Sequence, residues 1–121
     1  MQKAIEQDVD IINMSFGFKK DIPELKQLVN QAKKENIKII AAAGNTYGFY
    51  TSYPAKYTSV ISIGSEEKNR IANYSAVEDV DYFLKGNFKH EKNQGTSIST
   101  AYFTGILTNN LLNGEKNILK K

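Results

Sequence analysis

The chain has 121 residues, a length that suits one domain or less. Hydrophobic residues make up 40% and charged residues 24%, which are ordinary proportions for a globular protein. The absence of cysteine excludes disulfides, thiolate metal sites and a cysteine nucleophile. The net charge is +3 and the one lysine-rich cluster, residues 116–121, is terminal, so a nucleic-acid partner is not expected. No apolar run approaches the ~20 residues of a membrane span, so no membrane partner is expected either.

The first third of the chain predicts a helix, a strand and a second helix. Residues 2–7 indicate the end of a helix, and the apolar run at residues 10–14 indicates a buried strand. Asp21 and Glu24 have the spacing of a capping box at a helix start. Apolar residues follow at helical spacing, so an amphipathic helix is predicted over residues 22–35, with Asp21 as its N-cap.

The rest of the chain adds two strands and a helix. Residues 37–43 and 60–64 are short apolar runs of the kind that form buried strands. Residues 65–94 are polar and give few signals, whereas residues 97–110 indicate a helix. Apolar runs without alternation, in the order strand, helix, strand, favour a parallel sheet in an α/β layer architecture.

Three segments of the chain carry motifs. They are DIINMSFG at residues 10–17, IIAAAGN at residues 39–45 and GTSIS at residues 95–99. In this order and with these gaps they resemble the subtilisin-like serine proteases, or subtilases, and the resemblance extends over residues 4–108. It implies an α/β, parallel-sheet, three-layer subtilisin-like fold that is incomplete at its N-terminal side. Residues 1–121 are then expected to form part of one subtilase catalytic domain.

The resemblance makes Ser97 the nucleophile of a serine endopeptidase and Asn45 a donor to the oxyanion. Ser97 would begin a helix after the tight turn that Gly95 permits, and the backbone N–H groups there favour negative charge. The tetrahedral intermediate of acyl transfer carries an oxyanion, and the Ser97 N–H and the Asn45 side-chain amide would be its donors. Taken singly, Ser97 would be interpreted as a helix N-cap serine and Asn45 as a turn asparagine.

The resemblance also implies a groove for a peptide or protein substrate. Ser15 and Gly17 would offer backbone groups for strand-like pairing with it, although Ser15 alone would be a plain turn residue. The Tyr53–Pro54 bond lies where the family commonly has a cis peptide, while trans is the ordinary state of such bonds. Two segments would form the pocket for the substrate residue before the cut: Ser15, Phe16 and Gly17, and Ala42, Ala43 and Gly44.

The other two members of the subtilase triad have no counterpart in this sequence. The family order is Asp, His, Ser, so both would lie upstream of Asp10. The one histidine, His90, matches no family motif and is expected to be a solvated loop residue. Asp79 and Asp81 do not occupy the place of the triad aspartate. Without the base only roughly 10³–10⁴ of rate enhancement over water would remain, so the chain alone is predicted to lack useful proteolytic activity.

No cofactor is evident from the sequence. No Asp, Glu or His spacing indicates a specific metal site, so none is assigned. Calcium is common among subtilases, but the family's best-known calcium loop would lie upstream. Residues 1–10 lack the apolar region of a signal peptide, so no export signal is expected within the chain, and the sequence does not decide the compartment.

Functions from different classes therefore stay open. In the first, an upstream segment supplies the triad Asp and His, and the chain is part of a serine endopeptidase. In the second, the chain is a catalytically inactive subtilase remnant or a peptide-binding module. An unrelated α/β ligand-binding domain is a third alternative. In both subtilase cases, missing upstream strands should leave a sheet edge and apolar surface exposed.

Overall fold

The computed structural model describes residues 1–89 and 92–114. His90 and the lysine-rich residues 116–121 lie outside the described residues, so the expectations for them stay untested. Every helix and strand predicted from the sequence is present, with bounds that shift by a few residues. The helices are α1 (Gln2–Glu6), α2 (Pro23–Lys34) and α3 (Thr96–Leu112), and the strands are β1 (Ile11–Met14), β2 (Lys38–Ala42), β3 (Ile61–Glu67), β4 (Arg70–Ile71) and β5 (Tyr82–Lys85).

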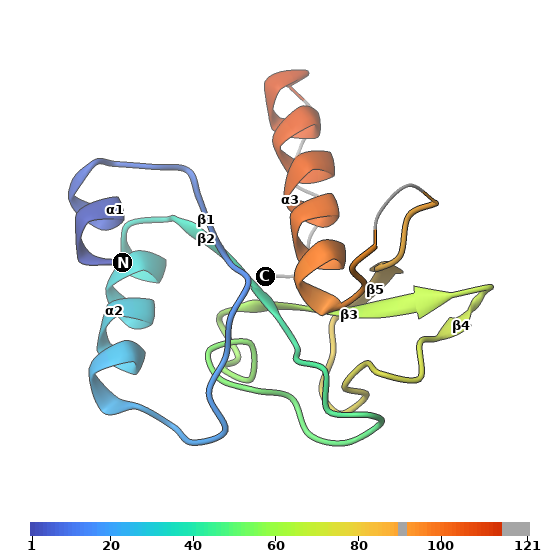
Figure 1. Cartoon of the computed structure of the whole chain (residues 1–121). Coiled ribbons are helices and arrows are strands. Elements are labelled where there is room, and N and C mark those ends of the chain that lie inside the picture. The colour runs from blue at the N-terminus through green and yellow to red at the C-terminus, as the bar shows by residue number, and fades with distance from the viewer. Residues whose placement is uncertain (90–91, 115–121) are drawn as a thin grey trace.

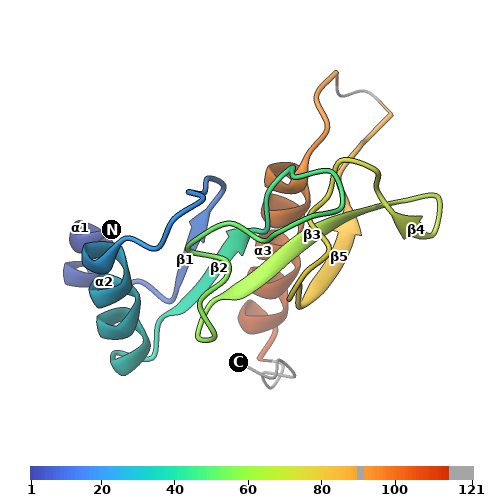
Figure 2. The same cartoon turned by 90° about the horizontal axis from the view of Figure 1, so that it is seen from below.

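Four of the strands form a parallel sheet. β1 pairs with β2, β2 with β3 and β3 with β5, and Figure 2 shows these strands side by side in that order. The short strand β4 pairs antiparallel with the end of β3. Met14 lies opposite Ala41, so β1 and β2 end at the same edge of the sheet. The segments that follow these two strands therefore emerge side by side.

The two faces of the sheet are covered by different helices. Side chains alternate along β2, so that Ile39 and Ala41 belong to one buried cluster and Ile40 to the other. The first cluster contains Val29 and Ala32 of α2, and the second contains Phe103 and Leu107 of α3. Helices α2 and α3 therefore lie on opposite sides of the strands (Figure 1), which confirms the predicted three-layer α/β fold.

The start of α2 differs from the prediction. The N-cap residue is Ile22 and no side chain caps the helix, so the prediction of Asp21 as N-cap was wrong. Asp21 instead accepts a hydrogen bond of 2.5 Å from the Tyr57 hydroxyl to its Oδ1. This contact joins the segment before α2 to the segment before β3, and it satisfies the hydroxyl of a buried tyrosine.

Residues 65–94 contain two strands that the sequence did not indicate. β3 continues to Glu67, and a turn at Lys68 and Asn69, which both have positive φ, leads into β4. β5 is parallel to β3, but its apolar residues Tyr82–Leu84 are only half buried. A short strand of this kind lacks the long apolar run that marked the other strands.

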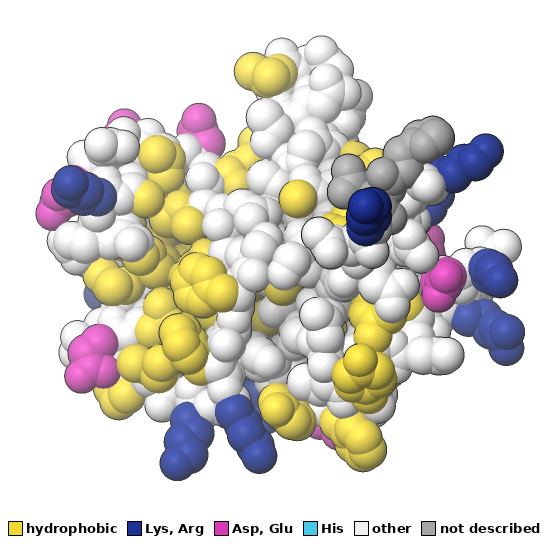
Figure 3. Space-filling model, viewed as in Figure 1, with side chains coloured by type: hydrophobic (Ala, Val, Ile, Leu, Met, Phe, Trp, Pro, Cys, Tyr) yellow, Lys and Arg dark blue, Asp and Glu magenta, His cyan; other side chains and the backbone are white. Residues whose placement is uncertain are grey.

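β1 forms an edge of the sheet in the described part of the chain, because its one strand partner is β2. Met14 is the one buried residue of this strand, so the expectation of a buried strand was wrong for Ile11 and Ile12, which are half buried. Figure 3 shows hydrophobic side chains gathered on the face where α1, α2 and β1 lie. An unpaired edge beside apolar surface is therefore present, as expected for an incomplete subtilase fold.

A cluster of buried hydroxyl groups lies between β3 and the start of α3. The Ser65 and Ser99 hydroxyls are 2.8 Å apart, and the Ser99 hydroxyl also donates to the Leu84 carbonyl at 2.9 Å. The Tyr74 hydroxyl is buried beside them and has no partner among the described residues. A Cβ on Gly86 would lie 2.4 Å from Ser65 Oγ and 2.7 Å from the other two hydroxyl oxygens. The cluster therefore leaves room only for glycine.

We expect Gly86→Ala to lower the free energy of unfolding by about 1–3 kcal/mol, because its methyl group would crowd three buried hydroxyls. Gly105→Ala is the matched control, since an added Cβ in this part of α3 meets nothing within 4 Å. It should be neutral or stabilising by up to about 1 kcal/mol, because alanine favours the helix. Urea unfolding of both variants tests the argument, and equal losses would contradict it.

The Tyr57 hydroxyl gives the folded chain a pH dependence in the alkaline range. Its pKa is raised from 10.0 to about 12, first by burial and second by the hydrogen bond to Asp21. The folded state thus favours the protonated phenol, and this stabilisation is complete below pH 10 and is lost as the pH rises from 10 to about 12. The free energy of unfolding should fall more steeply over this interval in the wild type than in Tyr57→Phe. Parallel slopes in urea titrations would refute this.

Candidate active site

The ends of β1 and β2 meet the first turn of α3 at the carboxyl edge of the sheet. Ligands of α/β proteins bind outside this edge. The three elements surround an open cavity of about 320 Å³, and all the site residues predicted from the sequence except Ala43 line it. The lining residues are Ser15, Phe16, Gly17, Ala42, Gly44, Asn45, Thr46, Ser52, Thr96 and Ser97.

Asn45 is held by Thr96, the residue before the predicted nucleophile. The Thr96 backbone N–H donates to Asn45 Oδ1 at 3.0 Å, and the Thr96 hydroxyl donates to the same oxygen at 3.1 Å. A backbone N–H can only donate, so this contact fixes which way the Asn45 carboxamide is turned. The amide nitrogen Nδ2 lies on the other side and donates to no acceptor among the described residues.

Thr96 also holds the end of β2. The Gly44 N–H donates to Thr96 Oγ1 at 3.1 Å, and the Thr96 side chain is almost completely buried. The Thr96 bonds to Gly44 and Asn45 are thus partly shielded from water, and they join the end of β2 to the start of α3.

The absence of a side chain at Gly95 leaves room for the Asn45 side-chain amide. Its φ of 154° lies in a region that side chains other than glycine rarely adopt. A Cβ at this position would lie 3.2 Å from Asn45 Nδ2. Any other residue would strain the turn and push against the amide, so the predicted need for glycine before Thr96 is confirmed.

The Ser97 hydroxyl makes its hydrogen bond with the end of β1. It donates to the Ser15 backbone carbonyl oxygen at 3.0 Å. In return, the Ser15 hydroxyl donates to the Ser97 backbone carbonyl oxygen at 3.4 Å. The Ser97 N–H lies in the first turn of α3, where N–H groups have no acceptor within the helix. Two donors, the Ser97 N–H and Asn45 Nδ2, thus belong to residues that line one cavity, at a helix end that favours negative charge.

Ser15 is supported by a hydrogen-bonded path to the middle of α3. Asn13 Nδ2 donates to Ser15 Oγ at 3.0 Å, and the Thr104 hydroxyl donates to Asn13 Oδ1 at 2.6 Å. The wall of the cavity on the β1 side is therefore tied to the helix that carries Ser97.

The segment after Ser15 is attached to the segment around Tyr53. Phe18 and Tyr53 exchange two backbone hydrogen bonds of 2.7 and 2.8 Å, and the Tyr53–Pro54 peptide bond is cis. Gly17, one residue before this bridge, makes no backbone hydrogen bond with the described residues. The Phe16 side chain is 51% exposed. This edge therefore has backbone groups available to a peptide.

Ala43 lies behind the cavity instead of lining it. Its side chain is fully buried, its N–H donates to the Ile63 carbonyl and its carbonyl accepts from the Ser52 N–H. Ala43 therefore supports the wall that Ala42 and Gly44 form. It was predicted to line the substrate pocket, but it is not among the residues that line this cavity.

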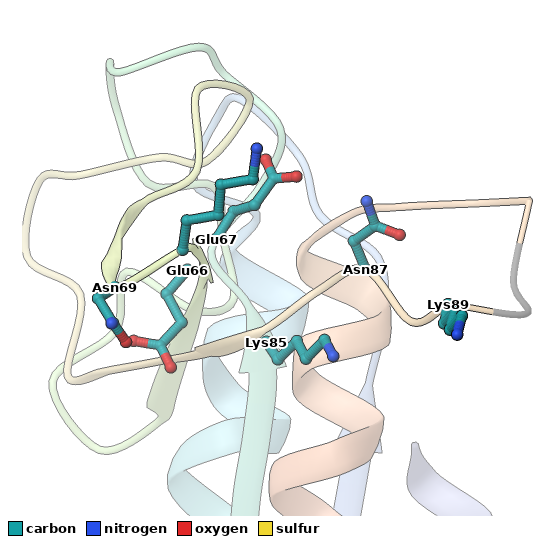
Figure 4. A pocket seen from close by; sticks show the side chains of 7 residues that line it. Glu66, Glu67, Asn69, Lys85, Asn87 and Lys89 are labelled. Atoms are coloured by element: carbon teal, nitrogen blue, oxygen red, sulfur yellow. The ribbon is translucent and has the colours of Figure 1, made fainter.

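A second cavity, of about 450 Å³, is larger but offers no comparable chemistry. Figure 4 shows Glu66, Glu67 and Asn69 on one side of it and Lys85 and Asn87 on the other, without a common point toward which they converge. The 320 Å³ cavity is the better candidate because it combines a serine hydroxyl with oriented donors.

No group of three or more His, Cys, Asp or Glu side chains that could hold a metal ion occurs in residues 1–89 and 92–114. Calcium therefore remains an expectation that rests on the family resemblance. Within the same described ranges, no helix is long and apolar enough to cross a membrane.

Sequence reasoning did not assign roles to Thr96, Ser52, Thr46 or Asn13. Thr96 stands inside the GTS motif, so its position was visible, but its hydrogen bonds depend on residues far away in the sequence. Ser52 and Thr46 lie in an aromatic-rich loop without a motif, and no signal in the sequence marks them as cavity residues.

Comparison with known proteins identifies the family of the chain. The family model described as "Subtilase family" matches residues 1–113 of the chain. The chain belongs to the subtilase family. It is 37% identical over 119 residues to the major intracellular serine protease of Bacillus subtilis (strain 168), covering 86% of this chain and 37% of that protein. It is 34% identical over 101 residues to the minor extracellular protease Epr of the same organism, covering 82% of this chain and 14% of that one.

Solved structures show the same fold. The chain superimposes on the prenylagaramide maturation protease PagA with a TM-score of 0.76 at 23% identity, covering 95% of this chain and 50% of that one. A mutant of the protease domain of PatA gives the same TM-score at 22% identity. The subtilase chain thus spans about 37% of the first curated relative and half of these structures.

We expect Thr96→Val to lower the free energy of unfolding by about 1–2 kcal/mol, because the partly buried Gly44 N–H would lose its acceptor. Thr96→Ser, which keeps the hydroxyl, should cost less. In NMR spectra the side-chain amide resonances of Asn45 should move in the valine variant and stay near their wild-type positions in the serine variant. Identical spectra for the wild type and Thr96→Val would contradict the orienting role of the hydroxyl.

Proposed function

We propose that this chain supplies the nucleophile and the oxyanion donors of a serine endopeptidase that acts on peptides or proteins. The triad Asp and His would come from polypeptide outside these 121 residues. The observation that carries the proposal is that the Ser97 hydroxyl, the Ser97 N–H and the unpartnered Asn45 Nδ2 belong to one cavity.

The chemistry would be acyl transfer. Ser97 Oγ would bond to the substrate carbonyl carbon while its proton passes to the histidine. The carbonyl oxygen would become an oxyanion, held by the Ser97 N–H and Asn45 Nδ2. The C–N bond would then break as the amine leaves with the proton from the histidine, and water would release the acyl group from Ser97 in the same manner.

The hydrogen bond between the Ser97 hydroxyl and the Ser15 carbonyl has to break in this mechanism. A carbonyl oxygen is a hydrogen-bond acceptor but not a general base, so this contact holds the hydroxyl without activating it. The same contact favours a second candidate function, in which the chain binds peptides without cutting them.

A fluorophosphonate probe separates the two candidates. The full chain is treated alone and then mixed with polypeptide from the upstream reading frame that carries the family's Asp and His motifs, and mass spectrometry locates the label. We expect labelling of Ser97 to be at least about 10³-fold faster in the mixture, because the base is then present. Ser97→Ala should remain unlabelled, and Asn45→Ala should label about 10²–10³-fold more slowly, the loss seen for such a donor in a subtilisin.

Absence of label in both samples, with circular dichroism confirming folded protein, would refute the endopeptidase proposal and leave the peptide-binding function. Equal labelling with and without the upstream polypeptide would show that the chain activates Ser97 by itself, which the proposal also excludes.

A further inference from the structure

Thr104, in the middle of α3, reaches out of its helix to β1. Its hydroxyl donates to Asn13 Oδ1 at 2.6 Å and also lies 2.9 Å from the Thr100 carbonyl oxygen, one turn earlier. The hydroxyls of Thr100 and Thr108 donate to carbonyl oxygens of α3 itself, which is the ordinary partner of a threonine inside a helix. The contact with Asn13 therefore distinguishes Thr104 from the threonines on either side of it.

The hydrogen bonds that lead from Thr104 to Ser97 all run in one direction. Because Asn13 turns its oxygen toward Thr104, its amide nitrogen faces Ser15 and donates to Ser15 Oγ at 3.0 Å. An amide nitrogen can only donate, so Ser15 Oγ accepts this bond and keeps its own proton. That proton is donated to the Ser97 carbonyl oxygen, 3.4 Å away. The path thus leaves α3 at Thr104, crosses the end of β1 and returns to α3 at Ser97.

The last bond of this path holds the backbone of Ser97. The Ser97 hydroxyl donates to the Ser15 carbonyl and has to leave it to attack a substrate. The bond from the Ser15 hydroxyl involves the Ser97 backbone instead, so it can persist when the Ser97 side chain turns. Oxyanion donors are most effective when they do not rearrange during the reaction, and the Ser97 N–H belongs to the backbone that this bond holds.

We propose that Thr104 is a positioning residue that acts on the Ser97 backbone through Asn13 and Ser15. Neither Thr104 nor Asn13 lines the active-site cavity, so neither contacts the substrate there. Asn13 and Ser15 are exposed, whereas Thr104 is half buried and fixes the direction of the path from α3. The effect on reaction rests on the proposed function, but the effect on the Ser97 backbone does not require that Ser97 be activated.

The first test measures the hold on Ser97 in the full chain alone. The NMR shift of a carbonyl carbon depends on the hydrogen bonds that its oxygen accepts, so the shift of the Ser97 carbonyl carbon is compared among variants. We expect it to move in Thr104→Val, which removes the hydroxyl and keeps the shape, and to stay near the wild-type value in Thr104→Ser. Thr108→Val is the matched control, because it removes a hydroxyl that bonds within the same helix, and it should leave the shift unchanged.

Asn13→Ala tests whether the path runs through Asn13. This variant should move the Ser97 shift as Thr104→Val does, and the double variant should move it no further, because either substitution interrupts the same path. Additive changes would show that Thr104 acts by another route and would overturn the proposal. Asn13→Ala changes an exposed side chain, so it also keeps the test available if Thr104→Val does not fold.

The second test measures the effect on the reaction. The fluorophosphonate, whose fluoride Ser97 Oγ displaces, is added at several concentrations to the mixture with the upstream polypeptide, which separates the affinity for the probe from the rate of the covalent step. We expect Thr104→Val to slow the covalent step about two- to ten-fold, the effect of one neutral hydrogen bond, without a change in affinity. Thr104→Ser should restore the rate. A loss in affinity alone, or an equal loss in Thr108→Val, would contradict the positioning role.

The outcomes for this inference and for the proposed function are distinguishable. If the wild type is not labelled in the mixture, the endopeptidase is refuted, and the Ser97 carbonyl shift alone decides whether Thr104 positions the Ser97 backbone. If the wild type is labelled but Thr104→Val keeps both the wild-type shift and the wild-type rate, the role of Thr104 is refuted and the enzyme remains. Circular dichroism of each variant confirms that folded chains are compared.

Discussion

The hydrogen bonds of Thr96 to Asn45 and Gly44 are the constraint on which the candidate site depends. They connect the end of β2 to the start of α3, and the residues that they join are 51 or 52 positions apart in the sequence. Because Asn45 Oδ1 accepts the two bonds that Thr96 donates, its amide nitrogen remains available in the cavity that Ser97 also lines. The same geometry requires Gly95, since a Cβ there would meet that nitrogen. One buried threonine thus sets the orientation of a donor and the residue type of its neighbour.

In the proposed function, the fold would contribute the parts of the chemistry that need rigidity, which can be ordered before substrate binds. A helix N-terminus and an oriented amide stabilise negative charge without rearrangement during the reaction. Proton transfer is different, since it requires a base within hydrogen-bond reach of Ser97. Within the described residues the Ser97 hydroxyl reaches a carbonyl oxygen instead. Under the proposed function, the chain would therefore supply ordered oxyanion donors, and the activation of Ser97 would depend on a base from outside these residues.

The sequence was sufficient where the signal is local. Apolar runs and helical spacing predicted β1, β2, β3, α2 and α3, and the motifs located Ser97 and Asn45. It was insufficient where two distant segments decide the outcome. Asp21 has the local spacing of an N-cap, but Tyr57 competes for its carboxylate across the fold. Ser52 has no motif, and its place between Gly17 and Gly44 exists only after both walls have formed.

The open edge at β1 lies close to the reactive residues, so the stability of the sheet and the geometry of the site are coupled. Ser15 follows directly after β1, and the path from Thr104 through Asn13 to Ser15 crosses this exposed end of the sheet. Hydrogen bonds exposed to water hold a backbone less firmly than buried ones, because water can replace either partner. A strand added beside β1 would bury Ile11 and Ile12 further and shield this path. The parts that complete the fold would therefore also stiffen the wall that contacts Ser97.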